Sequence, residues 1–248
     1  MLTSKTNAKN TIENTNEVYK IDADEVLKDF MTWYTYTYYN IRLSQDFIAE
    51  DQNANQISKS NFLQHLITGD FVAFKTAKKD NVAVYKLLKR EDLQTDIRNT
   101  IVQMAQTAIV LENMEGKELP TYHFTDLNGN SYDNKNTKGN VMLIKCWFIN
   151  CVACVKEFPE LNSLVDRYKN RNDVKFISLA SDSKADLISF LKKKPFNYAV
   201  VPKMDKYMTE QLNVNAYPLH LLINKEGKIV KATNSIEDML PYFEKEAG

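Results

Sequence analysis

CWFINCVACVKEFPEL, residues 146–161, contains all three cysteines of the 248-residue chain. Cys146 comes first, and Cys151 and Cys154 follow as a pair separated by two residues. The spacing C-x-x-C occurs in redox-active pairs, as half of a zinc site, and by chance among buried thiols. The sequence around the cysteines has to distinguish these three interpretations.

The position of the cysteine pair favours redox chemistry. VMLIKCWF, residues 141–148, is apolar nearly throughout and predicts a buried strand, and apolar residues at helical spacing follow Cys154. Cys151 therefore falls at the start of a predicted helix, where free amide groups stabilise a thiolate. We expect Cys151 to be the nucleophile and Cys154 to close the disulfide. Pro159 lies inside the helical pattern and should bend the helix.

The remaining composition argues against other kinds of site. The chain has no second C-x-x-C, and its three histidines, His65, His123 and His220, are not paired at ligand spacing, so we expect no metal site. We also expect no cofactor. The 32 basic and 32 acidic side chains give a net charge of zero, which offers no electrostatic basis for a nucleic-acid partner.

The chain divides by composition into three parts. We predict a flexible segment over residues 1–18, a small α+β domain over 19–112 and a second domain over 113–248. In the first domain, residues 22–31 predict a short helix capped by Asp22 or Asp24, and WYTYTYYNIRL, residues 33–43, predicts a strand because of its threonine and aromatic content. A helix over 60–67, a hairpin over 71–88 and a long amphipathic helix over 93–111 follow.

The second domain alternates between strands and helices. A turn-rich hairpin is predicted over residues 116–140, with the turn at Asn128-Gly129, followed by the strand before the cysteines. Further strands and helices alternate up to a hairpin that turns at Glu226-Gly227, and a helix closes the chain. This order predicts an α/β fold with a mixed central sheet and helices on both faces.

At this point residues 116–248 resemble the TlpA/ResA-like thiol-disulfide oxidoreductases, thioredoxin-fold redoxins of the bacterial cell envelope. The resemblance is carried by these stretches: GKELPTYHFTDLNGN, VMLIKCWF, CVAC, KEFPEL and NVNAYPLHLLINKEGKIV. It implies a thioredoxin fold preceded by an N-terminal β-hairpin, and a redox-active disulfide between Cys151 and Cys154.

The resemblance also implies a substrate-binding surface. Tyr217-Pro218 matches the cis-proline loop of the family, and with Ala216 it would offer main-chain groups to a bound substrate strand. Val152 and Ala153 occupy the dipeptide between the cysteines, where the family often has a proline or an acidic residue. Because this dipeptide adjusts the relative stability of thiolate and disulfide, the sequence does not give the reduction potential.

Four further titratable side chains are candidates for a role in the redox chemistry of the pair. Lys145 stands where many thioredoxins have a buried aspartate; we expect it to extend to the surface, whereas an inward lysine would favour a thiolate. We expect Glu157 and Glu160 to lie on a solvated helix face, with proton transfer to Cys154 as the alternative. We expect His220 to be a satisfied core histidine.

Cys146 lies within the predicted core strand. A resolving or redox-sensing cysteine needs access, and a core strand denies it. We therefore expect an inert buried thiol.

The predicted activity is reduction of protein or peptide disulfides, with an upstream thiol donor as the second partner. A binding module that holds the pair as a structural disulfide is the alternative from another class. A thiol peroxidase is less consistent with the sequence, because Phe148 and Ile144 stand where peroxiredoxins need a threonine and a proline.

The location of the protein rests on the resemblance, which implies the cell envelope or periplasm. The sequence begins without the basic start and apolar run of a secretory signal, and a stretch such as VMLI, residues 141–144, is too short to span a bilayer. No transmembrane segment is therefore expected, and a cytoplasmic location stays open as the alternative.

Overall fold

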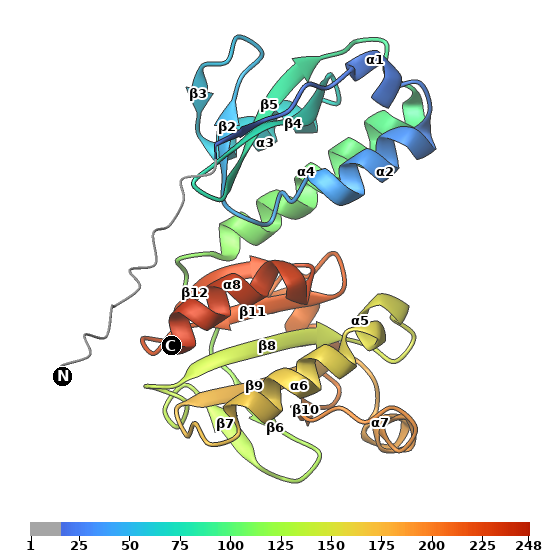
Figure 1. Ribbon diagram of the computed structural model, residues 1–248. Helices are drawn as coiled ribbons and strands as arrows, with labels where there is room; N and C mark the ends of the chain where they lie inside the picture. The colour runs from blue at the N-terminus through green and yellow to red at the C-terminus, as the bar shows by residue number, and fades with distance from the viewer. Residues whose placement is uncertain (1–15) are drawn as a thin grey trace, which may run out of the picture. The chain divides into compact units, whose positions relative to one another are not determined.

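A computed structural model describes residues 16–248 (Figure 1). Most of the predicted flexible segment lies outside these residues. Its last two residues, Glu17–Val18, form strand β1, which pairs with β4 (Phe71–Lys79). The described chain forms two compact units: one ends at Val102 and the other runs from Gln103 to Gly248 and includes Arg42–Gln45. The boundary that we predict at residue 112 remains a proposal.

The first unit is built on a five-stranded sheet of order β1-β4-β5-β2-β3. Its other elements are these: α1 (Ala23–Val26), α2 (Phe30–Asn40), β2 (Phe47–Glu50), β3 (Gln56–Ile57), α3 (Lys59–Ile67), β5 (Val82–Lys89) and α4 (Thr95–Met114), which continues into the second unit. The cap at Asp22, the helix over 60–67, the hairpin of β4 and β5 and the long helix agree with the prediction.

Helix α2 contradicts the prediction of a strand over residues 33–43. Asp29 caps the helix by accepting a hydrogen bond from the amide of Thr32 at 2.8 Å. Trp33 and Thr37, four residues apart, are the buried positions, which is the spacing of a helical face. The strand preference of threonine and aromatic residues is weak and depends on context, so the cap and this packing override it.

The second unit contains a five-stranded sheet of order β10-β9-β8-β11-β12 and the separate hairpin β6-β7. Its elements are these: β6 (His123–Thr125), β7 (Ser131–Asp133), β8 (Val141–Trp147), α5 (Val152–Lys156), α6 (Phe158–Tyr168), β9 (Val174–Ala180), α7 (Lys184–Leu191), β10 (Ala199–Val201), a π-helical turn η1 (Tyr207–Gln211), β11 (Leu219–Ile223), β12 (Ile229–Thr233) and α8 (Ile236–Ala247). Strands β8, β9 and β10 are parallel, and β11 and β12 add as an antiparallel hairpin. This is the thioredoxin fold that the sequence predicts.

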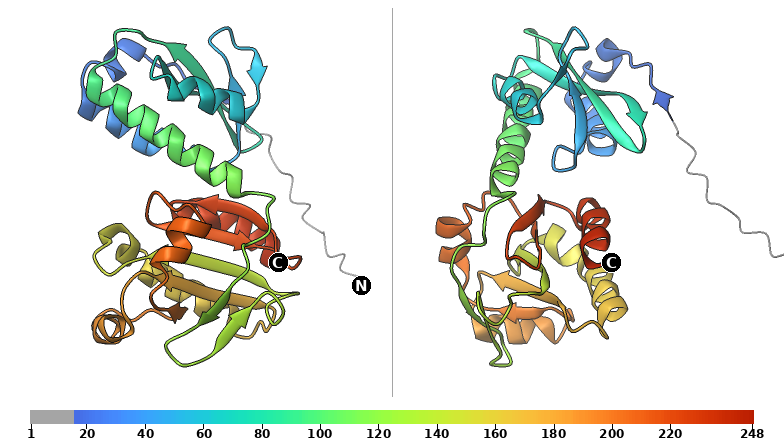
Figure 2. Two further views of the ribbon diagram at one scale, coloured as in Figure 1. Left: turned by 180° about the vertical axis from the view of Figure 1, so that it is seen from behind. Right: turned by 90° about the vertical axis from the view of Figure 1, so that its left-hand side faces the viewer.

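Two hydrophobic clusters cover the two faces of this sheet. One contains Leu161 of α6 and Phe243 of α8, and Figure 2 shows both helices on the same side of the sheet. The other contains Leu111 of α4, Phe124 of β6 and Met208 of η1. Strand β8 lies between β9 and β11, and all seven of its residues are buried. It therefore carries its C-terminal end, and the loop to the cysteines, on a rigid support.

Candidate active site

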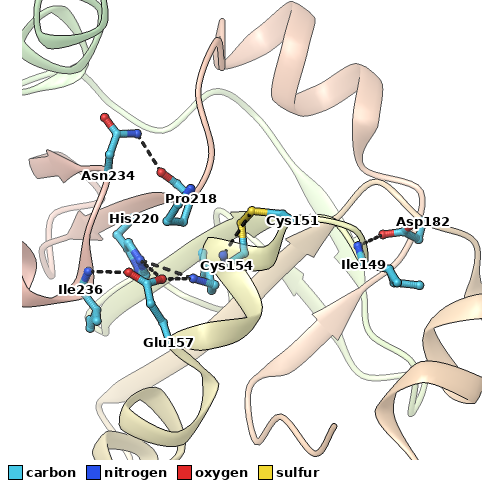
Figure 3. The surroundings of a disulfide bond; sticks show 10 residues. Ile149, Cys151, Cys154, Glu157, Asp182, Pro218, His220, Asn234 and Ile236 are labelled. Atoms are coloured by element: carbon cyan, nitrogen blue, oxygen red, sulfur yellow. Dashed lines mark hydrogen bonds and ion pairs between the residues drawn. A yellow bond between two sulfur atoms is a disulfide. The ribbon is translucent and has the colours of Figure 1, made fainter. Parts of the chain in front are cut away.

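The cysteine pair lies at the junction of β8 and α5. Cys151 is the N-cap residue of α5, and its sulfur accepts a hydrogen bond from the amide of Cys154 at 3.2 Å. The two cysteines form a disulfide with their Cα atoms 5.2 Å apart (Figure 3). Cys151 is 8% exposed and Cys154 is fully buried. Only Cys151 therefore reaches the surface, where another molecule could meet it.

The helix that carries the pair is interrupted one turn later. Helix α5 ends at Lys156, and α6 begins at Phe158 with Pro159 in its first turn. This confirms that the proline breaks the helical pattern. Glu157 is the residue at the break, and its side chain turns inward.

Lys145, Glu157 and His220 form a buried polar cluster beneath the pair. The ammonium group of Lys145 pairs with the Glu157 carboxylate, and Nε2 of His220 lies 3.0 Å from the same carboxylate oxygen. The other oxygen of Glu157 accepts the amide hydrogen of Ile236 at 2.9 Å. Lys145 and His220 are register partners on β8 and β11, so the sheet presents both groups to the helix break.

Two predictions about this cluster were wrong. Lys145 does not extend to the surface, because it lies in the middle of a strand that is covered on both faces and is itself fully buried. Glu157 does not lie on a solvated face, because its side chain is only 15% exposed and pairs with that lysine. Glu160 is exposed, as predicted. His220 is buried, but its Nδ1 has no partner among the described residues, so it is only half satisfied.

Burial and pairing act in opposite directions on the ionisation of these groups. Burial raises the pKa of Glu157, but the hydrogen bond from His220 and the charge of Lys145 outweigh it and lower the pKa to about 2. Burial lowers the pKa of His220, and the charge of Lys145 lowers it further. Burial also lowers the pKa of Lys145, against the raising effect of the Glu157 carboxylate. Glu157 is thus the group of the cluster that its two neighbours hold ionised.

The loop between η1 and β11 contacts the cysteine loop. The peptide bond between Tyr217 and Pro218 is cis. The ring of Tyr217 packs edge-on against Phe148, at 5.3 Å between ring centres, which joins this loop to the residues just before Cys151. Ala216 and Tyr217 are half-buried, and Pro218 is buried. Val152, between the cysteines, is 82% exposed, and Ala153 is exposed as well.

Two residues that the sequence did not suggest hold these loops in place. Asp182 accepts the amide hydrogen of Ile149 at 2.8 Å, and the side-chain amide of Asn234 donates to the carbonyl of Pro218 at 2.7 Å (Figure 3). Each lies more than fifteen residues from its partner in the chain, so no local pattern could have indicated the contact. Both fix main chain that borders the disulfide.

Cys146 is the only free cysteine of the chain, and it is fully buried in β8. Burial raises the pKa of its thiol to about 12, so it stays protonated at neutral pH. Its burial in the core strand agrees with the prediction, and its inertness stays a prediction. Within residues 16–248, no cluster of three or more His, Cys, Asp or Glu side chains could hold a metal ion, and no helix is long and apolar enough to cross a membrane.

Comparison with known proteins places this geometry in a family. Residues 114–244, more than half of the chain, match the Redoxin family, and the chain therefore belongs to it. Thiol-disulfide oxidoreductase ResA of Bacillus subtilis (strain 168) is 30% identical over 118 residues, which cover 47% of this chain and 65% of the relative. The protein of the same name from Bacillus thuringiensis subsp. konkukian is 30% identical over 139 residues, 54% of this chain and 80% of the relative.

A solved structure is also similar to about half of the chain. The thioredoxin domain of a thiol-disulfide oxidoreductase from Bacteroides vulgatus is 26% identical with a TM-score of 0.48, over 53% of this chain and 96% of that one. The family match over residues 114–244 and the Bacillus thuringiensis relative, covered to 80%, assign this part of the chain to the ResA-like thiol-disulfide oxidoreductases. The first unit lies outside the matched residues.

Proposed function

We propose that this protein reduces disulfides of protein substrates through Cys151, with Cys154 as the resolving cysteine. The observation that carries the proposal is the asymmetry of the pair. Cys151 keeps a small exposed area and its sulfur accepts an amide hydrogen bond, whereas Cys154 is fully buried. An amide donor stabilises a thiolate on the sulfur that it contacts, so the accessible sulfur is also the better nucleophile.

The reaction proceeds by two exchanges. The Cys151 thiolate attacks one sulfur of the substrate disulfide, so that a mixed disulfide forms and the other substrate sulfur leaves as a thiolate that takes up a proton. Cys154 then loses its proton and attacks Cys151, which releases the second substrate thiolate. Two electrons pass to the substrate, and the protein is left with the disulfide seen here. An upstream dithiol donor must reduce it again.

The loop of Ala216, Tyr217 and Pro218 is the proposed site for the main chain of the substrate. An extended segment that carries the substrate disulfide would add to this loop by backbone hydrogen bonds. Asn234 and the Phe148–Tyr217 contact keep the loop in register with the cysteines. Val152 and Ala153 would contact the substrate side chains next to the attacked sulfur. By its resemblance to envelope redoxins, we place the protein in the cell envelope.

Trapping of the intermediate tests the proposal. With a protein disulfide as substrate, Cys154→Ser should accumulate a mixed disulfide on non-reducing gels, because the resolving thiol is absent. Cys151→Ser should form none, and Cys146→Ser should behave as the wild type. Formation of the adduct through Cys154 instead would contradict the assigned roles.

The direction of exchange is measured by equilibration in thiol buffers. A reduction potential of the Cys151/Cys154 pair near that of thioredoxin, about −270 mV, is expected for a reductase. A value close to about −120 mV would indicate a disulfide donor. A pair that does not exchange at all would leave a structural disulfide in a binding module.

A further inference from the structure

An open groove begins beside the active-site cysteines on the side of α5 and α6. Its volume is about 730 Å³. Its apolar lining comes from seven residues: Ile149, Val152, Val155, Phe158, Pro159, Phe190 and Pro195. Val152 lies between the two cysteines and is 82% exposed, so the groove and the reactive sulfur share one border. The proposed exchange through Cys151 and Cys154 does not itself use this groove.

The two walls of the groove are fixed to one another. The side chain of Asn162 on α6 donates to the carbonyl of Pro195 at 3.0 Å and accepts the amide hydrogen of Asn197 at 2.8 Å. Behind the wall, the rings of Phe158 and Phe196 stack with their centres 4.0 Å apart and their planes 6° apart. The groove is thus formed before any ligand arrives, and a preformed site loses less free energy to ordering on binding.

The charged side chains that line the groove are all positive. Lys156 and Lys194 line it and are exposed, and the lining contains no aspartate or glutamate. Within the described residues, neither lysine forms an ion pair. An apolar floor beside two uncompensated cations is complementary to an apolar side chain that is accompanied by a carboxylate.

We propose that this groove binds the substrate segment that flanks the attacked cysteine, and that it selects an apolar residue next to an acidic one. The inference rests on the proposed reduction of protein disulfides and names a substrate class for it. In the mixed disulfide the substrate sulfur is bonded to Cys151, so residues on one side of it lie over the 216–218 loop. Residues on the other side reach the groove across Val152, since an extended chain advances about 3.3 Å per residue.

Matched disulfide peptides test the selection. Three peptides would differ only beside the cysteine, with the sequences Leu-Glu, Leu-Lys and Ser-Glu, and the pre-reduced full-length protein would reduce each in single-turnover experiments at low salt. We expect the Leu-Glu peptide to react about fivefold faster than Leu-Lys, because opposite charge accelerates encounter and like charge slows it. The Ser-Glu peptide should react severalfold more slowly than Leu-Glu, because it loses the apolar contact. The preference for Glu over Lys should shrink as salt is added.

Variants of the two lysines show whether the groove is responsible. In the double variant Lys156→Gln/Lys194→Gln, the preference for Glu over Lys should fall to about twofold or less. Lys169→Gln, an exposed change just beyond the opposite end of α6, is the matched control and should retain the full preference. Each peptide rate is divided by the rate of the same protein with hydroxyethyl disulfide, a small uncharged substrate, so that a change in the reactivity of the pair itself is separated from a change in selection.

The outcomes separate the two proposals. If the double variant keeps the full preference, or if the three peptides react equally, the groove does not select the substrate. Continued reduction of hydroxyethyl disulfide would then leave the proposed function standing. If the wild type reduces neither the peptides nor hydroxyethyl disulfide, the proposed function fails, and the inference that rests on it fails with it.

Discussion

Lys145 and Glu157 place two opposite charges beneath a redox pair without adding net charge. Lys145 is fully buried, and Glu157 is its ion-pair partner. The amide of Ile236 and the ring of His220 also donate to the carboxylate, so we expect it to stay ionised in a variant without the lysine. Loss of either partner therefore leaves a single charge close to Cys154, three residues before Glu157 on the chain.

The reduction potential of the pair should respond with opposite sign to the two losses. Lys145→Met leaves the carboxylate, which disfavours a thiolate and so favours the disulfide, and it should lower the potential. Glu157→Gln leaves the ammonium group and should raise it. We expect shifts on the order of 30 mV, which corresponds to about 1.4 kcal/mol, measured by equilibration in thiol buffers at neutral pH. Shifts in the same direction would mean that packing, and not charge, sets the effect.

The free energy of unfolding should also show that Lys145 and Glu157 are coupled. Breaking a buried ion pair by removing one partner typically costs about 3–5 kcal/mol, because the remaining charge is uncompensated. We expect each single variant to lower the free energy of unfolding of the oxidised protein by roughly this amount. The double variant Lys145→Met/Glu157→Gln should lose clearly less than the sum of the two. Urea unfolding of the wild type, the two single variants and the double variant measures these free energies. Strictly additive losses would contradict a direct ion pair between the two residues.

Acid should remove the contribution of Glu157. Its pKa is lowered from 4.5 to about 2 in the folded protein, so its stabilising effect is complete above the unfolded value and is lost as pH falls from about 5 toward 2. The difference in unfolding free energy between wild type and Glu157→Gln should therefore shrink over that range. A difference that stays constant down to about pH 3 would show that Glu157 is not ionised in the fold.

At the scale of elements, α2 offers a direct test of helix against strand. Thr35 is exposed on this helix, on the side away from the buried Trp33 and Thr37. Thr35→Ala should leave stability unchanged or raise it by up to about 0.5 kcal/mol, because alanine is the better helix former. Thr35→Pro should cost about 3 kcal/mol or more, because proline removes a helical hydrogen bond. A stability loss from the alanine substitution would favour a strand at this position.

The elements also show what the sequence could and could not predict. The cysteine pair at a strand-to-helix junction, the break at Pro159 and the hairpins follow from local patterns, and the structure contains all of them. Helix α2 was missed because its aromatic and threonine residues favour strands, while its cap and buried face depend on packing. The positions of Lys145 and Glu157 were missed because their contact joins a strand to a helix twelve residues later. Such contacts are set by the tertiary fold and leave no periodic signal.

At the scale of the whole molecule, the end of α4 belongs to the core of the redoxin unit. Leu111 and Met114 are buried in the cluster that covers one face of its sheet. The residues that match the family begin only at 114, so a fragment cut at that point would lack Leu111. The first unit ends at Val102, so a fragment that begins at Gln103 would keep Leu111.

Two fragments test this boundary. Residues 103–248 should fold and reduce hydroxyethyl disulfide at a rate close to that of the full chain. Residues 113–248 should be less stable by about 2–5 kcal/mol, the usual cost of deleting a buried leucine side chain. Equal stability of the two fragments in urea would place the boundary at 112, as the composition suggests. If fragment 103–248 reacts more slowly than the full chain with a protein disulfide but equally fast with hydroxyethyl disulfide, substrate selection would be assigned to the first unit.

The sealed thiol of Cys146 gives the protein an internal standard for its own redox state. Because this thiol and that of Cys154 are fully buried, an alkylating reagent applied to the folded protein should modify no cysteine in the oxidised form and only Cys151 in the reduced form. After denaturation, the same reagent should label Cys146 alone in the oxidised form and all three cysteines in the reduced form. The mass of the labelled chain therefore reports the oxidised fraction directly, in a cell extract as well as in a purified sample, with every cysteine left in place.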